Sequence, residues 1–431
     1  MSAGPFFDRE AETAPREVLK ARQLDRVRKI IAVAFERSPF YQRKYRAAGL
    51  SSAEDVRSLD DVHHLPFTTK DELVADHEEH PPFGSRMTEP RERYIRLHQT
   101  SGTSGKPLRI LDTEESWQWF VRGWGYVYNA AGVGATDRVF AAFSFGPFIG
   151  FWAGFEGAAH VGALRIPGGG QTTGQRIQQI FDLGATVLIC TPTYALRMAD
   201  TAREMGVDLR TSPIRIGIHA GEPGASIPST RARLEQAWGM EVFDHPGMTE
   251  VGAWGFECRE HAGVHLNEAE CLFEVLDPAT GDPGDEGELV ITTLGRFAHP
   301  NIRYRTGDRV HVLRDPCGCG RTFYRLDGGV IGRIDDMLIV RGVNVFPSAI
   351  ENIVRRFDGV HEFVVEVYRD REMDEMEIKV EATAEDLAAL LQAIQNEVHL
   401  RMGFRPIVSA APAGTLPRFE LKARRVLDRR Q

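Results

Sequence analysis

Residues 100–107 have the composition of a phosphate-binding loop. Glycine lets the main chain approach a ligand closely, and successive backbone N–H groups in such a loop can form a concavity that binds anions. Hydroxyl groups and a lysine ammonium are suitable donors for phosphate oxygens. The loop consists of Thr100, Ser101, Gly102, Thr103, Ser104, Gly105, Lys106 and Pro107.

The residues on either side of this loop predict a hairpin. Residues 94–97 have the pattern of a strand that enters the loop, and residues 108–110 that of a strand that leaves it. The loop differs from that of P-loop NTPases, because only two residues separate Gly102 from Gly105 and a proline follows the lysine. A flexible surface loop is the alternative, since clusters of Gly, Ser and Thr are common there.

Four further polar segments follow predicted strands or turns. They are residues 219–223, 245–250, 304–308 and 332–336. Open α/β sheets bind ligands beyond the carboxyl ends of their strands, so these segments are candidates for one shared site.

Of the five cysteines, Cys190 lies in a predicted buried strand. The other four are Cys258, Cys271, Cys317 and Cys319. An odd number of cysteines argues against a disulfide framework. Cys317 and Cys319 form a tight Cys-x-Cys turn, and Cys258 is followed by two histidines. These types suit a closed tetrahedral zinc site, with free thiols as the alternative. The fourth ligand is either His261 or His265, and Cys271 stays outside the site.

Composition limits the class of protein. The chain has 431 residues, 42% of them hydrophobic and 26% charged, with a net charge of −9. This acidic balance argues against a general nucleic-acid partner. The first residues lack the pattern of a signal peptide, and no apolar run reaches the about 18 residues of a membrane span. The expectation is a cytoplasmic protein that binds neither nucleic acid nor a membrane, with a homodimer as the default oligomer.

Hydrophobic patterning predicts an α/β fold in two domains, 1–334 and 335–431. Residues 14–48 have apolar positions at helical spacing. Strands then alternate with helices, and a β-rich part follows over 271–313. Strands are expected at 139–143, 163–166, 186–190, 214–219 and 241–244, and helices at 174–183, 195–205 and 229–238. The smaller domain is α+β, with strands at 337–340, 362–368 and 375–381 and a helix at 384–402.

Taken in order along the chain, these segments resemble the adenylate-forming superfamily of acyl-CoA synthetases, and within it the phenylacetate–CoA ligase family. The resemblance runs from residue 17 to residue 426. Its most specific parts are the run from Gly332 to Pro347, GRIDDMLIVRGVNVFP, and the run from Ile302 to Asp308, IRYRTGD. The resemblance also favours His265 over His261 as the fourth zinc ligand.

The resemblance implies a role for each motif. The 100–106 loop would hold the β- and γ-phosphates of ATP, Thr249 would contact the α-phosphate, and Glu250 would bind Mg²⁺. Lys422 would be the catalytic lysine of a mobile C-terminal lid that turns at Asp335. The other ATP-binding residues would be Gly221, Glu222, Pro223, Asp244, His245, Asp308 and Arg333. Alternatives are a helix-start carboxylate for Glu250 and a turn residue for Asp308.

Residues 143–152 are rich in aromatic residues and glycine. Together with residues 191–196, which follow a strand end, they could form a flat apolar slot for an aromatic acid. Core packing is the alternative for each aromatic residue. His245 could face this slot or the nucleotide, or be a structural histidine. The acyl-pocket residues would be Phe143, Phe145, Gly146, Phe148, Tyr194, Ala220, Gly247 and Met248.

The implied activity is that of an AMP-forming acid–thiol ligase. It would use ATP and Mg²⁺ to convert an aryl or arylacetic acid to an acyl-adenylate, and CoA to form the thioester, with a structural Zn²⁺. The alternatives are transfer of the aryl group to a carrier protein or to a phenolic hydroxyl, and a non-catalytic nucleotide-binding relative. The chain departs from the family pattern at Pro246, where a Tyr is usual, and at Leu421, where a Gly is usual.

Overall fold

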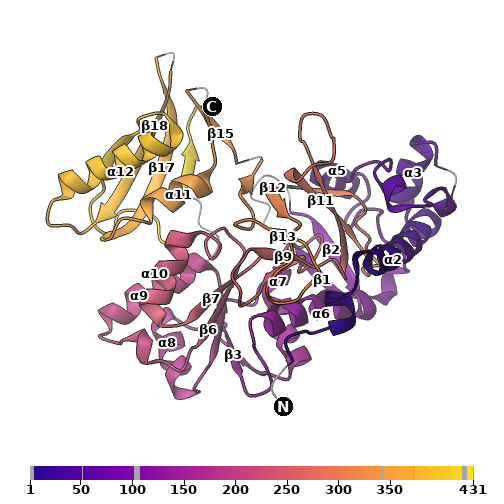
Figure 1. Cartoon of the computed structure of the whole chain (residues 1–431), viewed down its shortest axis with the longest axis horizontal. Coiled ribbons are helices and arrows are strands. Elements are labelled where there is room, and N and C mark those ends of the chain that lie inside the picture. The colour runs from indigo at the N-terminus through magenta and orange to yellow at the C-terminus, as the bar shows by residue number, and fades with distance from the viewer. Residues whose placement is uncertain are drawn as a thin grey trace.

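The computed structural model describes residues 4–50, 52–100, 107–334, 336–341, 343–371, 373–419 and 425–430. Its elements form a large body and a smaller C-terminal unit, which Figure 1 shows in orange and yellow above helices α9 and α10. This mixed α/β architecture confirms the predicted fold class. None of the described helices combines the length and the apolar character that crossing a membrane requires.

The large body contains a five-stranded parallel sheet, in the order β4-β3-β5-β6-β7. All four pairings are parallel, as the predicted alternation of strands and helices requires. The strands are β3 (Arg138–Ala141), β4 (Leu164–Pro167), β5 (Val187–Cys190), β6 (Ile216–Ala220) and β7 (Glu241–His245).

Helices cover both faces of this sheet. One face packs with α8 (Thr173–Asp182), α9 (Pro192–Glu204) and α10 (Pro228–Trp238), and the other with α6 (Glu114–Ala130) and α7 (Ile149–Gly157). Local signals set the helix ends: the Thr172 hydroxyl caps α8 by accepting from the Gln175 N–H, and Gly239 ends α10 with φ +69°. The predicted strands and helices of this region are therefore confirmed within a few residues.

The β-rich part is a seven-stranded sheet in the order β10-β11-β12-β13-β9-β8, with β14 paired to β12. Burial alternates strictly along β12, which places every second side chain in the core. The strands are β8 (Gly255–Glu257), β9 (Val264–Leu266), β10 (Cys271–Leu276), β11 (Glu286–Thr293), β12 (Tyr304–Leu313), β13 (Arg325–Leu326) and β14 (Gly332–Arg333).

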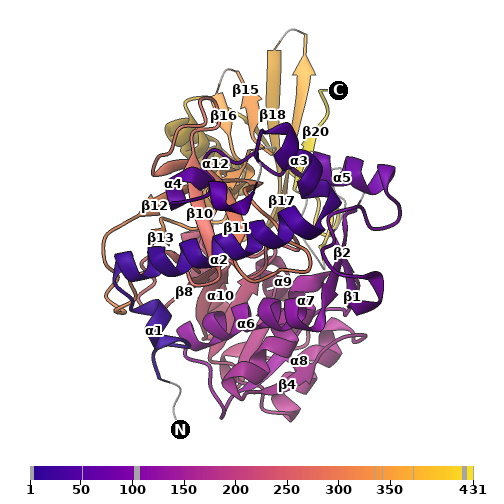
Figure 2. The same cartoon turned by 90° about the vertical axis from the view of Figure 1, so that its right-hand side faces the viewer.

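Two N-terminal helices, α2 (Arg16–Arg37) and α3 (Pro39–Ala47), share a core cluster with this sheet, and α2 crosses in front of it in Figure 2. The predicted apolar face is buried except at Leu24, which is half-buried. Gln23 is buried instead, and its Nε2 donates to the Glu268 carbonyl at 2.9 Å. The remaining short helices are α1 (Arg9–Glu12), η1 (Ala53–Asp55), α4 (Leu59–Val62), α5 (Lys70–Glu79), η2 (Arg91–Arg93), η3 (Ala158–Val161) and η4 (Leu209–Thr211).

The predicted hairpin is present: β1 (Tyr94–Gln99) and β2 (Arg109–Thr113) form an antiparallel pair. Thr100, the first residue of the predicted phosphate loop, is described by the structure and is buried. Its N–H donates to the Leu108 carbonyl at 3.0 Å, and its Oγ1 accepts from the Leu108 N–H at 3.0 Å. Residues 101–106 lie outside the described residues.

The C-terminal unit is a four-stranded sheet in the order β19-β18-β17-β20, covered by two helices. The predicted helix at 384–402 begins at residue 387, because the Asp386 carboxylate accepts from the Ala389 N–H and caps it. The elements are β15 (Leu338–Val340), β16 (Val343–Val345), α11 (Pro347–Val354), β17 (Val360–Asp370), β18 (Met373–Ala382), α12 (Leu387–Met402), β19 (Ile407–Ala410) and β20 (Val426–Asp428).

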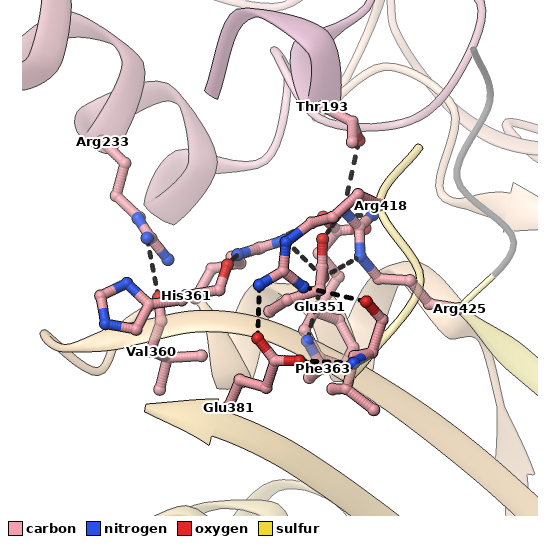
Figure 3. Close-up of polar contacts among 12 residues, drawn as sticks. Thr193, Arg233, Glu351, Val360, His361, Phe363, Glu381, Arg418 and Arg425 are labelled. Carbon is pink, nitrogen blue, oxygen red and sulfur yellow. Dashed lines mark hydrogen bonds and ion pairs between the residues drawn. The ribbon is translucent and has the colours of Figure 1, made fainter. Parts of the chain in front are cut away.

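Arginines join the C-terminal unit to the large body (Figure 3). Arg233 of α10 donates from Nη2 to the Val360 carbonyl at 2.8 Å. Arg425 is buried, pairs with Glu362 at 2.7 Å and Glu351 at 3.3 Å, and also donates to Oγ1 of Thr193 in the large body at 3.3 Å. The buried Glu362 therefore depends on Arg425 and on a second arginine, Arg355, at 3.1 Å.

We expect Arg425→Met to lower the free energy of unfolding by about 3 kcal/mol, because removal of one partner leaves Glu362 buried with less compensation. Urea denaturation measures this change. Arg429→Met is the matched control, since Arg429 pairs with Glu366 at 2.9 Å but is exposed, and such pairs contribute at most about 1 kcal/mol. Equal losses in the two variants would contradict the prediction.

Candidate functional site

The carboxyl ends of β5, β6 and β7 bring several predicted segments to one edge of the parallel sheet. Ala220, the last residue of β6, lies beside His245, the last residue of β7. Glu222 accepts at Oε1 from the Thr193 N–H at 2.9 Å, which joins the loop after β6 to the loop after β5. Gly221 has φ +94°, a conformation that favours glycine, so the chain can turn sharply at this point.

The hairpin β1–β2 also reaches this edge. The Gln99 N–H donates to the Pro147 carbonyl at 2.9 Å, so the end of β1 contacts the predicted acyl-pocket segment. This places Thr100, the first residue of the predicted phosphate loop, one residue away from that contact.

Glu250 lies in a turn after β7 and is buried. No helix begins at this residue, so the helix-start alternative is not observed. The Tyr304 hydroxyl donates to Oε1 of Glu250 at 3.2 Å. Burial, and then the nearby carboxylate, raise the pKa of Tyr304 well above its usual range, so this hydroxyl keeps its proton. Glu250 therefore has one fixed donor and a second oxygen that could bind a cation.

Asp308 and Arg333 face each other across β12 and β14, where they are paired in register. Arg333 Nη1 lies 3.3 Å from Oδ1 of Asp308. Asp308 lies within a strand rather than in a surface turn, and its N–H donates to Thr306 Oγ1 at 3.0 Å. Asp335 and Lys422 lie outside the described residues, and their roles stay predictions.

Asp244 is buried at the end of β7 next to a second carboxylate. Its N–H donates to Oε2 of Glu257 at 2.9 Å, and Arg231 forms a bidentate pair with Glu257 at 2.8 and 2.7 Å. Burial, followed by repulsion from Glu257, raises the pKa of Asp244 from 3.8 to about 7. Asp244 is therefore partly protonated at neutral pH and can donate as well as accept a hydrogen bond.

His245 is held by the protein itself. Its Nδ1 lies 2.7 Å from the Gly255 carbonyl, and its ring meets Trp124 edge to face with centroids 4.4 Å apart. Burial lowers its pKa to about 4, so the ring is neutral at physiological pH. These contacts match the structural alternative and leave the two binding roles as predictions.

The predicted acyl-pocket aromatics belong to two different clusters. Phe145 packs edge to face with Phe143 at 5.3 Å and with Trp152 at 4.7 Å, on the face covered by α6 and α7. The Trp152 Nε1 donates to the Gly146 carbonyl at 2.8 Å. Tyr194 packs on the opposite face of the sheet, where its hydroxyl accepts from Arg176 at 2.6 Å. The slot formed by these residues stays a prediction, and Tyr194 lies apart from its other aromatics.

Cys258, His265, Cys317 and Cys319 converge near strands β8 and β9, with all four ligand atoms within 4.8 Å of one another. The Sγ atoms of Cys258 and Cys317 are 3.8 Å apart, and Cys319 Sγ lies 3.4 Å from Nε2 of His265. Tetrahedral zinc with Zn–S bonds of about 2.3 Å has edges of about 3.8 Å between sulfurs, so the spacing fits this metal. Nδ1 of His265 lies 3.3 Å from the Phe323 carbonyl, a contact that orients the ring.

His261, the alternative ligand, belongs to a different network. Its Nδ1 lies 3.3 Å from Glu257 and its Nε2 lies 3.2 Å from Glu241. A hydrogen bond with Glu257 raises the pKa of His261, which favours its charged form. The structure therefore selects His265 over His261 as the fourth donor of the cysteine cluster.

The comparisons with known proteins agree with this geometry. The family model described as AMP-binding enzyme matches residues 9–297, which is more than half of the chain. The chain belongs to the AMP-binding enzyme family. A second model, AMP-binding enzyme C-terminal domain, matches residues 342–430. These matches confirm the resemblance to adenylate-forming ligases.

The sequence similarity to known ligases covers nearly the full length of this family member. It is 34% identical to a phenylacetate–coenzyme A ligase from Thermus thermophilus over 453 aligned residues, which cover 99% of this chain and 100% of the relative. It also resembles a crystal structure of 2-hydroxyisobutyryl-CoA ligase in the postadenylation state with R3-HIB-AMP. The TM-score is 0.94 at 28% identity, over 99% of this chain and 92% of the other.

A second crystal structure of that ligase is in the thioesterification state, with 2-HIB-AMP and CoA. It matches with a TM-score of 0.75 at 30% identity, over 99% of this chain and 93% of the other. With 2-HIB-AMP bound, the same ligase in the postadenylation state matches with a TM-score of 0.93, so this family member has an arrangement closer to the postadenylation structures.

Sequence patterns gave no role to several residues that surround the site. Tyr304 lies inside a quoted motif, but nothing in the motif indicated that its hydroxyl meets Glu250. Asp112 and Arg296 belong to no motif, and they form an ion pair across 184 residues of sequence behind the Thr249–Glu250 turn. Such a pairing has no local signal, because neither residue type nor spacing links the two positions.

We expect the pKa of Asp244 to make unfolding free energy depend on pH. A carboxyl group with a raised pKa in the folded state stabilises the protein fully below its unfolded pKa, and this contribution is lost as pH rises to about 7. The free energy of unfolding of the wild type minus that of Asp244→Asn should therefore fall by on the order of 4 kcal/mol between pH about 4 and about 7. Urea denaturation at several pH values measures it. Asp208→Asn, at an exposed position, should follow the wild-type profile, and a flat difference for Asp244→Asn would contradict the prediction.

Proposed function

We propose that this chain is an ATP-dependent ligase that joins an aromatic, aryl or arylacetic, carboxylic acid to CoA. In the first half-reaction the carboxylate oxygen attacks the α-phosphorus of ATP, and the bond to pyrophosphate breaks. In the second, the CoA thiol loses its proton and its sulfur attacks the acyl carbon, which releases AMP. Two observations carry the proposal. One is full-length similarity to phenylacetate–CoA ligases, and the other is that Tyr304 contacts Glu250 of the Thr249–Glu250 turn from β12, the strand on which Asp308 pairs with Arg333 of β14.

The chemical types of Thr249, Glu250, Asp308 and Arg333 suit the charges that develop in the first half-reaction. Glu250 would hold Mg²⁺, because a carboxylate is the hard oxygen ligand that this cation prefers. Thr249 would contact the α-phosphate, and Asp308 would accept hydrogen bonds from ribose hydroxyls while Arg333 approaches the same group. Gly221, Glu222 and Pro223 would line the adenine, and partly protonated Asp244 would be near them.

Residues 335–431 would act as a lid that carries Lys422. A lysine is a point charge on a flexible stem, which suits a group that contacts the phosphates and then withdraws. The higher similarity to the postadenylation structure supports a lid arrangement that belongs to adenylation. The contacts of Arg233 and Arg425 across the two units would stabilise this arrangement.

The aromatic residues around Phe145 would form one wall of the acyl slot, with Ala220, Gly247 and Met248 at the sheet edge. A slot with aromatic walls and few polar groups suits an aryl ring rather than a short polar acid. The acid itself would be identified by a screen.

We expect ATP–pyrophosphate exchange with phenylacetate or benzoate-type acids, and little with short aliphatic acids. Glu250→Gln should lower the exchange rate by about 10²–10³-fold, because it removes the charge that holds Mg²⁺ against the developing charge. Lys422→Ala should lower it as well, whereas Lys20→Ala, an exposed lysine on α2, should leave it unchanged.

Mass spectrometry of the product separates the acceptors, since CoA should yield an aryl- or arylacetyl-CoA thioester. Full exchange activity in Lys422→Ala, or exchange with none of the aromatic acids, would contradict the proposed function.

The cysteine cluster would hold one structural Zn²⁺ through Cys258, His265, Cys317 and Cys319. The metal would cross-link the strands β8 and β9 to the loop after β12, because the cysteines and the histidine come from all three. Bound zinc stabilises the folded chain, since the ligands are not preformed in the unfolded chain.

We expect about one zinc per chain by elemental analysis of protein purified without chelators. His265→Gln should lose the metal and lower the melting temperature, because one of four ligands is removed. His261→Gln is the matched control and should keep the metal, since His261 contacts Glu257 and Glu241 instead. Equal metal content in the two variants would exclude this ligand set.

A further inference from the structure

Asp112 and Arg296 form an ion pair in which both side chains are fully buried. Nε of Arg296 donates to Oδ1 of Asp112 at 2.8 Å, and Nη2 donates to Oδ2 at 2.5 Å. Two parallel hydrogen bonds fix the guanidinium in plane and in direction. A buried pair of this kind is weak evidence for stability alone, because removing both charges from water costs about as much as the pair returns.

The third nitrogen of this guanidinium points to the turn that carries Glu250. Nη1 of Arg296 donates to the Thr249 carbonyl at 2.7 Å and to the Glu250 carbonyl at 3.0 Å. The Glu250 carbonyl also accepts from Nδ2 of Asn301. The main chain on both sides of the Glu250 side chain is thus held from behind, while Tyr304 holds the carboxylate from another side.

The other end of the pair belongs to the hairpin. Asp112 lies on β2, and the strand opposite it, β1, ends beside Thr100. The residue before it, Leu111, has its backbone N and O both 3.2 Å from Nδ1 of His299. Two consecutive residues of β2 therefore contact the segment 296–299, which in turn holds the turn at Thr249 and Glu250.

The Arg296 side chain is enclosed on all sides, so it cannot easily shift the hairpin relative to the Thr249–Glu250 turn. Its guanidinium lies over the ring of Phe120 at 4.9 Å from the centroid, and its side chain has no exposed surface. The hydrogen bonds donated by its Nε, Nη1 and Nη2 end on the Asp112 carboxylate and on the carbonyls of Thr249 and Glu250.

We infer that Asp112 and Arg296 are positioning residues for the first half-reaction, which fix the phosphate-binding hairpin at one distance from the Thr249–Glu250 turn. The inference rests on the proposed function. A triphosphate with its Mg²⁺ must meet the hairpin and Glu250 together, and a misplacement of about 1 Å can cost about 10²-fold in rate. The second half-reaction starts from an adenylate that has lost the β- and γ-phosphates, so it depends less on this spacing.

The test variant is Arg296→Lys, which keeps the positive charge but not the fork that bonds the carboxylate and both carbonyls. Three measurements are made on the full chain: calorimetric binding of α,β-methylene-ATP with Mg²⁺, ATP–pyrophosphate exchange with phenylacetate, and CoA thioester formation from supplied phenylacetyl-adenylate. We expect binding to weaken at least about 10-fold and exchange to fall about 10²-fold, with thioester formation changed less than about fivefold.

Arg303→Lys is the matched control. Arg303 is also buried, pairs with Glu274 at 2.8 Å and donates to the His63 carbonyl at 2.6 Å, and its side chain has no hydrogen bond or ion pair with those residues assigned to the nucleotide that the structure describes. It should change the two half-reactions by the same factor. Asp112→Asn, which keeps the shape of the carboxyl group, should repeat the Arg296→Lys pattern and serves where the lysine variant fails to fold.

Unchanged binding of α,β-methylene-ATP by both Arg296→Lys and Asp112→Asn, or an equal fall of both half-reactions in them, would overturn the positioning role while the proposed function stands. Absence of nucleotide binding by the unmodified chain would overturn the proposed function, and this inference with it. An Arg303→Lys variant that weakens only the first half-reaction would show that any buried arginine pair gives this pattern, and would also overturn the inference.

Discussion

A charge removed from water needs an opposite charge within hydrogen-bonding distance, and this chain meets that need with arginines. Asp112, Glu274 and Glu362 are each buried, and each pairs with an arginine from a distant part of the sequence. The guanidinium has more donors than one carboxylate can use, so the remaining N–H groups of Arg296 and Arg303 bind backbone carbonyls of nearby loops. Loops that would otherwise vary in position are thereby fixed to the sheets.

The residues proposed to bind the nucleotide come from three structural parts. The parallel sheet supplies the loops after β5, β6 and β7, because carboxyl ends of parallel strands lie at the same edge. The β-rich sheet supplies Asp308, Arg333 and Tyr304, and the hairpin supplies Thr100. Of the buried pairs, Asp112–Arg296 joins two of these parts, since Asp112 lies on the hairpin and Arg296 in the loop after β11.

Among the described residues, a few side chains of the large body form hydrogen bonds with the C-terminal unit, and Ser229 of α10 contacts Asn352 of α11. Arg233 reaches one backbone carbonyl, and Arg425 reaches one threonine hydroxyl. Its strong partners, Glu351 and Glu362, belong to the C-terminal unit itself. Contacts of this kind can form in one arrangement and break in another without disturbing either core, which agrees with the different TM-scores for two states of one ligase.

Local patterns in the sequence were enough to predict most helices and strands and the motifs. Strict alternation of strands and helices predicted the parallel sheet, and the apolar spacing of residues 14–48 predicted the N-terminal helices, because both signals are local. The predicted hairpin is also present for that reason. The motifs, such as Gly332–Arg333 and Thr306–Asp308, were sufficient to predict the family, which the family models confirm.

Contacts between residues far apart in the sequence could be read from the folded chain alone. Two histidines stood at suitable spacing from Cys258, and the path of β9 selected His265 by bringing it to Cys319. Tyr194 and Phe145 both follow strand ends, but alternate side chains of a strand and its flanking loops point to opposite faces, and the two rings lie in different clusters. Asp112 and Arg296 had no distinguishing pattern in the sequence, because their pairing depends on how the hairpin packs against the loop after β11, and such packing leaves no periodic or local signal.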